Sequence, residues 1–189
     1  RNSYSHHAQV GHNVKSRARE NFILYNRIMD ESSGQSSYAV DLPDGGLSYI
    51  IGNSIQQGSN TENSTIVAYG AEGLRHDNNE IYLVNNTIVN DRSGGTFVSI
   101  KSGVSRSKLI NNLFVGSGTL VSGPADLTSN LHTDAPEFED RSSFDYHLRE
   151  NSPAVNVGVE PGMENGISLA PDQEYIHPVS HINRRPVGQ

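Results

Sequence analysis

The stretch Leu83-Val84-Asn85-Asn86-Thr87-Ile88 carries the pattern that decides the fold. It has two aliphatic residues, a variable position, an Asn, a second variable position and an apolar residue. Three further hexads share this pattern: Ile23-Leu24-Tyr25-Asn26-Arg27-Ile28, Ile50-Ile51-Gly52-Asn53-Ser54-Ile55 and Leu109-Ile110-Asn111-Asn112-Leu113-Phe114. The fourth-position Asn recurs every 26–33 residues. Such a fixed period indicates a repeat architecture in which each repeat forms one structural unit.

A second column of short apolar runs lies between these Asn positions. Each run is too short for a helix, and turns rich in Gly or Asn bound nearly all of them. The runs are Val10–Val14, Tyr38–Leu42, Ile66–Tyr69, Phe97–Ile100 and Leu120–Val121. A β-sandwich would also use short strands, but it would not hold Asn at one phase of the period. The two columns therefore favour a β-solenoid.

One Asn per coil has a physical reason at a corner. Asn tolerates left-handed backbone geometry, and stacked side-chain amides can hydrogen-bond from one coil to the next. Two weaker members extend the series, Asn2 with Tyr4 and Leu127 with Asn130. On this reading the chain opens in the middle of a repeat, and we expect further coils to precede it.

The Asn-Asn-x-apolar corners resemble those of the right-handed parallel β-helix of the pectate-lyase-like superfamily. The resemblance covers residues 1–132 and implies about five coils. Residues 133–189 resemble the irregular C-terminal tail that follows many bacterial β-helices, packed along the solenoid. The Arg184-Arg185-Pro186-Val187-Gly188 segment is similar to the end of such a tail. We therefore expect an all-β protein with a solenoid and a tail.

Composition restricts the partners. The chain has 14 Lys and Arg against 21 Asp and Glu, a net charge of −7, which argues against nucleic-acid binding. It has no Cys, and therefore no thiolate metal site or cysteine nucleophile. No apolar run approaches the roughly 20 residues of a membrane span. Asn, Ser and Gly make up nearly a third of the chain, which suits many tight turns.

The positive charge is concentrated at the start of the chain. The first 27 residues hold five Lys or Arg against one Glu, together with His6, His7 and His12. A local cationic groove on an acidic protein would suit an anionic polymer such as a uronate polysaccharide. We therefore expect an acidic polysaccharide or another glycan as the partner.

Lys15-Ser16 precedes the Asn26 corner as a Lys-Ser pair does in the β-helix alginate and chondroitin lyases. The resemblance implies that Lys15 acts as base or carboxylate neutraliser in β-elimination. Arg17 would lower the pKa of Lys15 and orient the uronate, and Tyr69 or His12 would be the acid. Asp41 stands where those lyases have Arg, so Lys15 is also open to a binding role or to simple pairing with Asp41.

Further candidates lie on the next coils. Asp41, Glu72, Arg75 and His76 are the predicted substrate-binding residues, although a Gly-rich turn with solvated side chains would explain the last three slightly better. No metal site is predicted, because the adjacent His6 and His7 should point apart on a strand. Calcium near Asp41, Asp44 or Glu72 is left open. An inverting glycosidase is disfavoured because its acidic motifs are absent.

These observations leave two functions. The first is a secreted, periplasmic or cell-surface protein that acts on an acidic polysaccharide, as a β-eliminating lyase if it is an enzyme. The alternative is a non-catalytic carbohydrate-binding or structural, adhesive β-solenoid, which needs only the repeats. Whether the protein is an enzyme, which sugar it recognises and its oligomeric state are open at the level of sequence.

Overall fold

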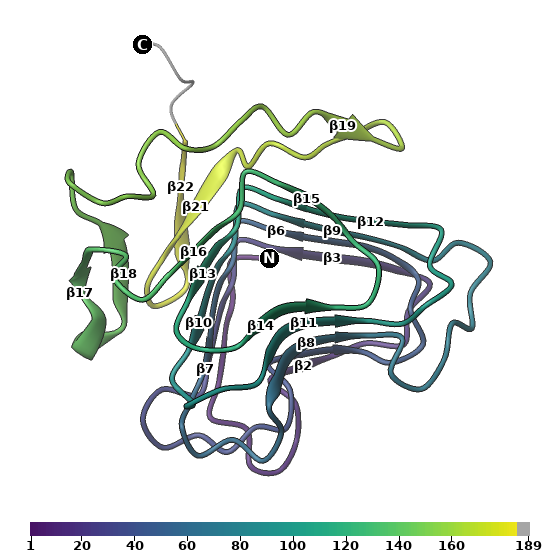
Figure 1. Cartoon of the computed structure of the whole chain (residues 1–189), viewed down its shortest axis with the longest axis horizontal. Coiled ribbons are helices and arrows are strands. Elements are labelled where there is room, and N and C mark those ends of the chain that lie inside the picture. The colour runs from purple at the N-terminus through teal and green to yellow at the C-terminus, as the bar shows by residue number, and fades with distance from the viewer. Residues whose placement is uncertain (185–189) are drawn as a thin grey trace.

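The computed structural model describes residues 1–184, so the Arg185–Gly188 part of the predicted tail lies outside the described residues. Strands that are three apart in the chain pair side by side and in parallel. They build three sheets around one interior, as the view along the stack in Figure 1 shows. Among residues 1–184 the helical structure is one 3-10 turn, η1 (Arg141–Ser143).

The three sheets contain six, five and five strands. The first sheet consists of β1 (Tyr4–His6), β4 (Arg27–Met29), β7 (Ser54–Gln57), β10 (Thr87–Asn90), β13 (Leu113–Val115) and β16 (Leu131–Thr133). The second sheet consists of β2 (Val14–Lys15), β5 (Val40–Leu42), β8 (Thr65–Tyr69), β11 (Thr96–Ile100) and β14 (Thr119–Ser122). The third sheet consists of β3 (Glu20–Leu24), β6 (Leu47–Ile51), β9 (Glu80–Val84), β12 (Arg106–Ile110) and β15 (Asp126–Thr128). This is a parallel β-helix of about five coils, and it confirms the predicted all-β solenoid.

Like residues stack along the interior of the solenoid. Val14, Val40, Val67, Val98 and Val121 are register neighbours in the second sheet. The first sheet contributes a column of Ile28, Ile55, Ile88 and Phe114, and the third contributes Ile23, Ile50, Leu83 and Leu109. Full burial of each such side chain contributes about 1.5–3 kcal/mol. The apolar runs of the sequence are therefore the walls of one continuous core.

The fourth-position Asn residues of the hexads form a ladder at the corner between the third and first sheets. Oδ1 of each Asn accepts hydrogen bonds from both the backbone N and Nδ2 of the Asn one coil earlier, at 2.9–3.1 Å. The Nδ2 atoms of Asn53, Asn86 and Asn112 also donate to backbone carbonyl oxygens. Asn86, for example, donates to Ile50 O at 2.8 Å. Asn53, Asn86 and Asn112 are at most 2% exposed. The ladder thus satisfies amides that are buried away from water.

The structure corrects two details of this corner. The left-handed residue is the one before the ladder Asn: Tyr25, Gly52, Asn85, Asn111 and Ser129 all have φ between 50° and 66°. The first coil is also shifted by one residue from the expected match. Asn2 occupies the left-handed position with φ of 57°, and Ser3 occupies the ladder position, where its N–H donates to Asn26 Oδ1 at 3.1 Å. The fourth-position Asn therefore contributes the ladder hydrogen bonds, and the residue before it adopts the left-handed backbone conformation.

The tail runs over the outer faces of two sheets (Figure 1). It contains the hairpins β17 (Phe138–Asp140) with β18 (Asp145–Leu148), β19 (Met163–Glu164) with β20 (Ile167–Ser168), and β21 (Gln173–Ile176) with β22 (Ser180–Asn183). Leu169 packs on Tyr49 and Tyr82 of the third sheet, and Phe138 packs with Val89 and Leu113 of the first. The outer face of the second sheet carries no tail segment among the described residues (Figure 1). One lateral face of the solenoid is left accessible.

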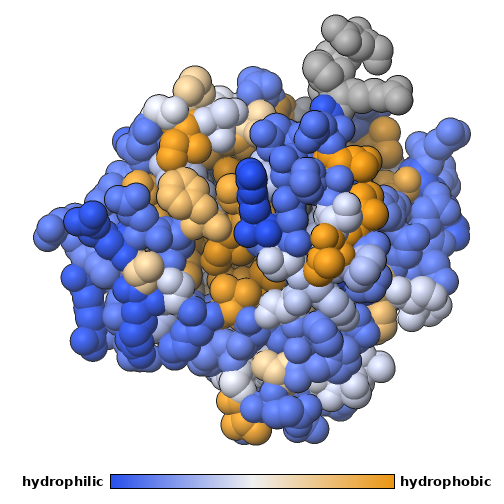
Figure 2. Space-filling model, turned by 180° about the vertical axis from the view of Figure 1, so that it is seen from behind, coloured by the Kyte–Doolittle hydropathy of each residue, from blue (hydrophilic) through white to orange (hydrophobic). Residues whose placement is uncertain are grey.

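The first coil forms one end of the stack and exposes apolar side chains. Val10 is 65% exposed and Phe22 is 47% exposed. Figure 2, which views the molecule from the side opposite to Figure 1, shows apolar side chains gathered near the middle of that face. β1, β2 and β3 are the edge strands of their sheets, so they present unpaired backbone groups there.

Replacement of Asn86 by Ala tests the ladder. The change removes the acceptor of the buried backbone N of Asn53, and one of the three acceptors of Asn53 Nδ2, which keeps Ile23 O and Ile51 O. Since each unsatisfied buried donor costs about 1–3 kcal/mol, we expect the free energy of unfolding to fall by about 3 kcal/mol in urea denaturation. The matched control is Asn85→Gly, where Gly accepts the φ of 52° and the loss should be about 1 kcal/mol or less. Equal losses in the two variants would contradict the role given to the ladder.

Candidate functional site

The outer face of the second sheet brings the predicted residues Lys15 and Asp41 together. They are register neighbours and point outward because Val14 and Val40 point inward. Lys15 Nζ lies 2.9 Å from Asp41 Oδ2. The Asp41 side chain is 3% exposed and that of Lys15 is 36% exposed. Asp41 Oδ1 is buried without a hydrogen-bond partner among the described residues, so this carboxylate depends on Lys15 for its compensation.

His12 completes the buried side of this pair. Its Nε2 lies 3.4 Å from Asp41 Oδ2, and its Nδ1 accepts a hydrogen bond from Tyr38 N at 3.2 Å. The neutral ring therefore holds its proton on Nε2, facing Asp41. Burial lowers the pKa of His12, and Asp41 partly opposes this by favouring the charged form. His12 acts in the structure as a neutral partner of Asp41.

Arg17 and Glu72 lie on the solvent side of the same cluster. Arg17 Nη1 contacts Asp44 Oδ1 at 2.7 Å, and Nη2 contacts both Glu72 oxygens at 2.7 Å. Lys15 Nζ lies 3.6 Å from Glu72 Oε1. Arg75 joins through its Nε, which lies 3.4 Å from Asp44 Oδ1. Three cations thus balance three carboxylates, and the hydrogen bond from Arg17 lowers the pKa of Glu72.

The direction of the Lys15 shift is opposite to the one expected from the sequence. The hydrogen bond to Asp41 raises the pKa of Lys15, and the opposing effect of Arg17 is smaller. Arg17 is turned toward Asp44 and Glu72, which offset its charge. Lys15 is consequently held as a cation, which suits binding of a carboxylate but not removal of a proton.

Tyr69 and His76 do not join the cluster. Tyr69 is 1% exposed in the interior, and its OH donates to Gly46 O at 2.5 Å. Burial raises the pKa of Tyr69, so it is a structural phenol and lies on the opposite face of the sheet from Lys15. His76 lies on the loop after β8, and its Nε2 is buried without a partner among residues 1–184. The structure therefore gathers His12, Lys15, Arg17, Asp41, Glu72 and Arg75, together with Asp44.

The predicted separation of His6 and His7 is wrong. His7 has a left-handed φ of 53°, which turns its ring so that the Nδ1 atoms of the two residues lie 2.8 Å apart. Within residues 1–184, no group of three or more His, Cys, Asp or Glu side chains is placed to hold a metal ion. The carboxylates near which calcium was left open, Asp41, Asp44 and Glu72, are paired with Lys15 and Arg17. No described helix is long and apolar enough to cross a membrane.

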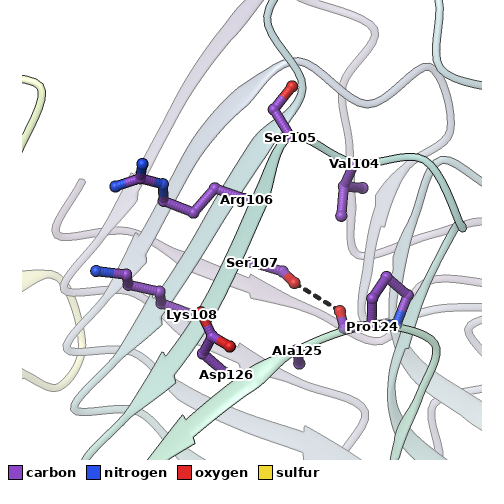
Figure 3. A pocket seen from close by; sticks show the side chains of 8 residues that line it. All are labelled: Val104, Ser105, Arg106, Ser107, Lys108, Pro124, Ala125 and Asp126. Atoms are coloured by element: carbon purple, nitrogen blue, oxygen red, sulfur yellow. Dashed lines mark hydrogen bonds between the residues drawn. The ribbon is translucent and has the colours of Figure 1, made fainter.

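Two hollows lie outside this cluster. The first, of about 420 Å³, lies where β15 covers only part of β12 (Figure 3). Arg106 and Lys108 extend from one side of it, and both contact Glu164 of the tail, Arg106 Nη1 at 2.8 Å. Ser107 Oγ donates to Pro124 O at 2.5 Å. Both cations beside this hollow are therefore engaged by the tail.

The second hollow is a groove of about 720 Å³ between the first sheet and the hairpins β17–β18 and β21–β22. None of the site residues predicted from the sequence lies in the tail. The alternation of aromatic and ionisable residues in Phe144-Asp145-Tyr146-His147 is the signal that could have indicated one. The tail has no repeat, so its position over Ser54 and Thr87 could not be read from the pattern.

No family model, curated protein or solved structure matches the chain. The parallel β-helix accordingly rests on the sheet topology itself, and membership of the pectate-lyase-like superfamily stays a prediction from the Asn corners.

The protonation of His12 can be measured by NMR titration of its ring signals. We expect a midpoint below the ordinary value of 6.5, because burial disfavours the imidazolium. In Asp41→Asn the midpoint should fall further, since the attraction of the carboxylate is lost. A wild-type midpoint at or above 6.5 would show that His12 is solvated and that the cluster is not assembled as described.

Proposed function

We propose that this protein is a non-catalytic β-helix that binds an acidic polysaccharide along the outer face of its second sheet. The observation that carries the proposal is the placement of Arg17 and Lys15 around the carboxylate of Glu72. Glu72 is 46% exposed, and it occupies the position that a uronate carboxylate of a ligand would take. Exchange of one carboxylate for the other keeps the charge of the cluster balanced.

The two cations are pre-organised for such a ligand. Buried Asp41 holds Lys15, and Asp44, whose side chain is 12% exposed, holds Arg17. A ligand therefore would not have to order these long side chains, which reduces the entropic cost of binding. A planar guanidinium also matches the geometry of a carboxylate.

The face has room for an extended chain. From Lys15 and Asp41, the outward column of the second sheet continues through Ala68, Ser99 and Ser122. These small side chains repeat at one strand spacing, ~4.8 Å. Ala68 is 2% exposed, whereas Ser99 is half-buried and Ser122 is exposed. A polysaccharide running along the stack would meet this column and would end at the charged cluster. A secreted, periplasmic or cell-surface location fits such a partner.

Binding accounts for the cluster better than β-elimination does. A lyase would require a neutral base, whereas the pKa of Lys15 is raised. The predicted acid Tyr69 is buried with its OH bonded to Gly46 O, and the His12 Nε2 proton faces Asp41. These contacts support a site that holds a ligand without cleaving it.

Calorimetric titration with oligogalacturonate, oligomannuronate and chondroitin oligosaccharides tests the proposal. Arg17→Gln should weaken binding by about tenfold or more, since a charge-assisted hydrogen bond contributes about 1.5–3 kcal/mol. Glu72→Gln should strengthen binding, because it removes the internal competitor for Arg17 and Lys15. Arg17 is the better target than Lys15, whose loss would leave Asp41 buried and unpaired.

Arg19→Gln is the matched control, because Arg19 lies on the same coil with 76% of its side chain exposed. The same mixtures are followed for the ultraviolet absorbance of the unsaturated product of β-elimination, and we expect no rise. Failure of all these acidic oligosaccharides to bind, or equal losses in the Arg17 and Arg19 variants, would contradict the proposal. An absorbance rise that Lys15→Arg abolishes would contradict its non-catalytic part.

A further inference from the structure

The groove beside the first sheet is a second concave surface, built from both coils and tail. Its floor belongs to β4, β7 and β10, and its walls belong to the hairpins β17–β18 and β21–β22. In Figure 1 these hairpins lie beside the first sheet, away from the second sheet that carries the Lys15 cluster. The groove has a volume of about 720 Å³, which is the size of a small-ligand site.

The floor is a regular row of polar side chains. Arg27, Ser54 and Thr87 are register neighbours, so hydrogen-bonding groups repeat at one strand spacing of ~4.8 Å. The same column continues with Leu113 and Leu131, where Leu113 is 6% exposed and both pack in the cluster that includes Phe138. The tail thus covers the apolar part of this column and leaves its polar part open.

The walls combine carboxylates, imidazoles and aromatic rings. His147 bridges the two hairpins: its Nδ1 contacts Asp145, and its Nε2 lies 3.5 Å from Glu174 Oε1. On the second hairpin, the Tyr175 OH lies 3.2 Å from His177 Nδ1. The side chains of Asp145 and Glu174 are 44% and 37% exposed, so both can accept hydrogen bonds from a ligand.

Two donors of the groove residues lack protein partners. The OH of Tyr146 and the Nε of Arg27 are both buried with no hydrogen-bond partner among the described residues. Arg27 is otherwise engaged, since its Nη1 donates to Phe144 O at 3.2 Å and its Nη2 lies 3.4 Å from Glu31. Buried polar groups are normally satisfied, so these two atoms are unused hydrogen-bonding capacity of residues that line the groove.

We propose that this groove binds a neutral oligosaccharide. Sugar hydroxyls both donate and accept, which matches a site that offers the carboxylates of Asp145 and Glu174 together with the donors of Arg27 and Arg184. The rings of Phe144 and Tyr175 offer apolar faces for the sugar ring. The two carboxylates offset the two guanidinium groups, so a polyanion gains no net attraction here. The site lies on a different sheet from the proposed acidic-polysaccharide site and does not depend on it.

Neutral hexasaccharides of glucose, mannose, xylose and N-acetylglucosamine are the probes. Binding is followed by calorimetry and by the NMR ring signals of histidine. We expect at least one hexasaccharide to bind and to shift the signals of His147 and His177, which line the groove, without shifting His12 on the second sheet. Thr87→Arg should weaken this binding at least tenfold, because a long side chain on the floor fills the groove.

Thr119→Arg is the matched control, since Thr119 is an exposed threonine of the second sheet. Glu174→Gln is a second variant that adds no bulk, removes the negative charge and replaces one acceptor oxygen by an amide donor, and it should also weaken binding. Absence of binding by all four hexasaccharides, shifts at His12 in place of His147 and His177, or unchanged binding in Thr87→Arg would overturn the proposal. If acidic oligosaccharides bind through Arg17 while neutral ones do not bind, the groove proposal fails and the proposed function stands.

Discussion

The asparagine ladder is the interaction on which the rest of the structure depends. At the corner between the third and first sheets, each coil must turn while its backbone amides are buried. In every link from Asn26 to Asn130, the Oδ1 of the next Asn accepts hydrogen bonds from one backbone N and one side-chain Nδ2. Because the ladder fixes the register of successive coils, it also aligns the interior columns, such as the five stacked Val residues of the second sheet.

That register determines what the outer faces can do. On each sheet, the outward positions form columns with one side chain per coil. The position of the tail determines which of these columns are covered. The tail buries Tyr49 and Tyr82 on the third sheet and part of the first sheet under Phe138. The described part of the tail does not cover the Lys15–Asp41 column of the second sheet or the Arg27–Ser54–Thr87 row of the first. Both proposed binding surfaces lie where the tail does not cover the sheets.

The sequence predicts the coils well because one Asn per period and one apolar run per sheet are physical requirements of stacking. Tyr69 shows what strand alternation adds: Ala68, and not Tyr69, is the register neighbour of Asp41, so Tyr69 must point inward. The left-handed turn of His7 and the shift that places Ser3 in the ladder depend on neighbouring coils. The groove depends on where an irregular tail lies, and no repeat encodes that position.

Hydrogen–deuterium exchange of the backbone amides of Asn26, Asn53, Asn86 and Asn112, resolved by NMR, tests the central role of the ladder most directly. These amides lie at corners between strands, where exchange is ordinarily fast. We predict that they exchange as slowly as the core-strand amides of Ile55 and Ile88, because both open only when the stack unfolds. Exchange as fast as that of the exposed turn at Ser142 would show that the corners open independently and that the ladder does not hold the coils together.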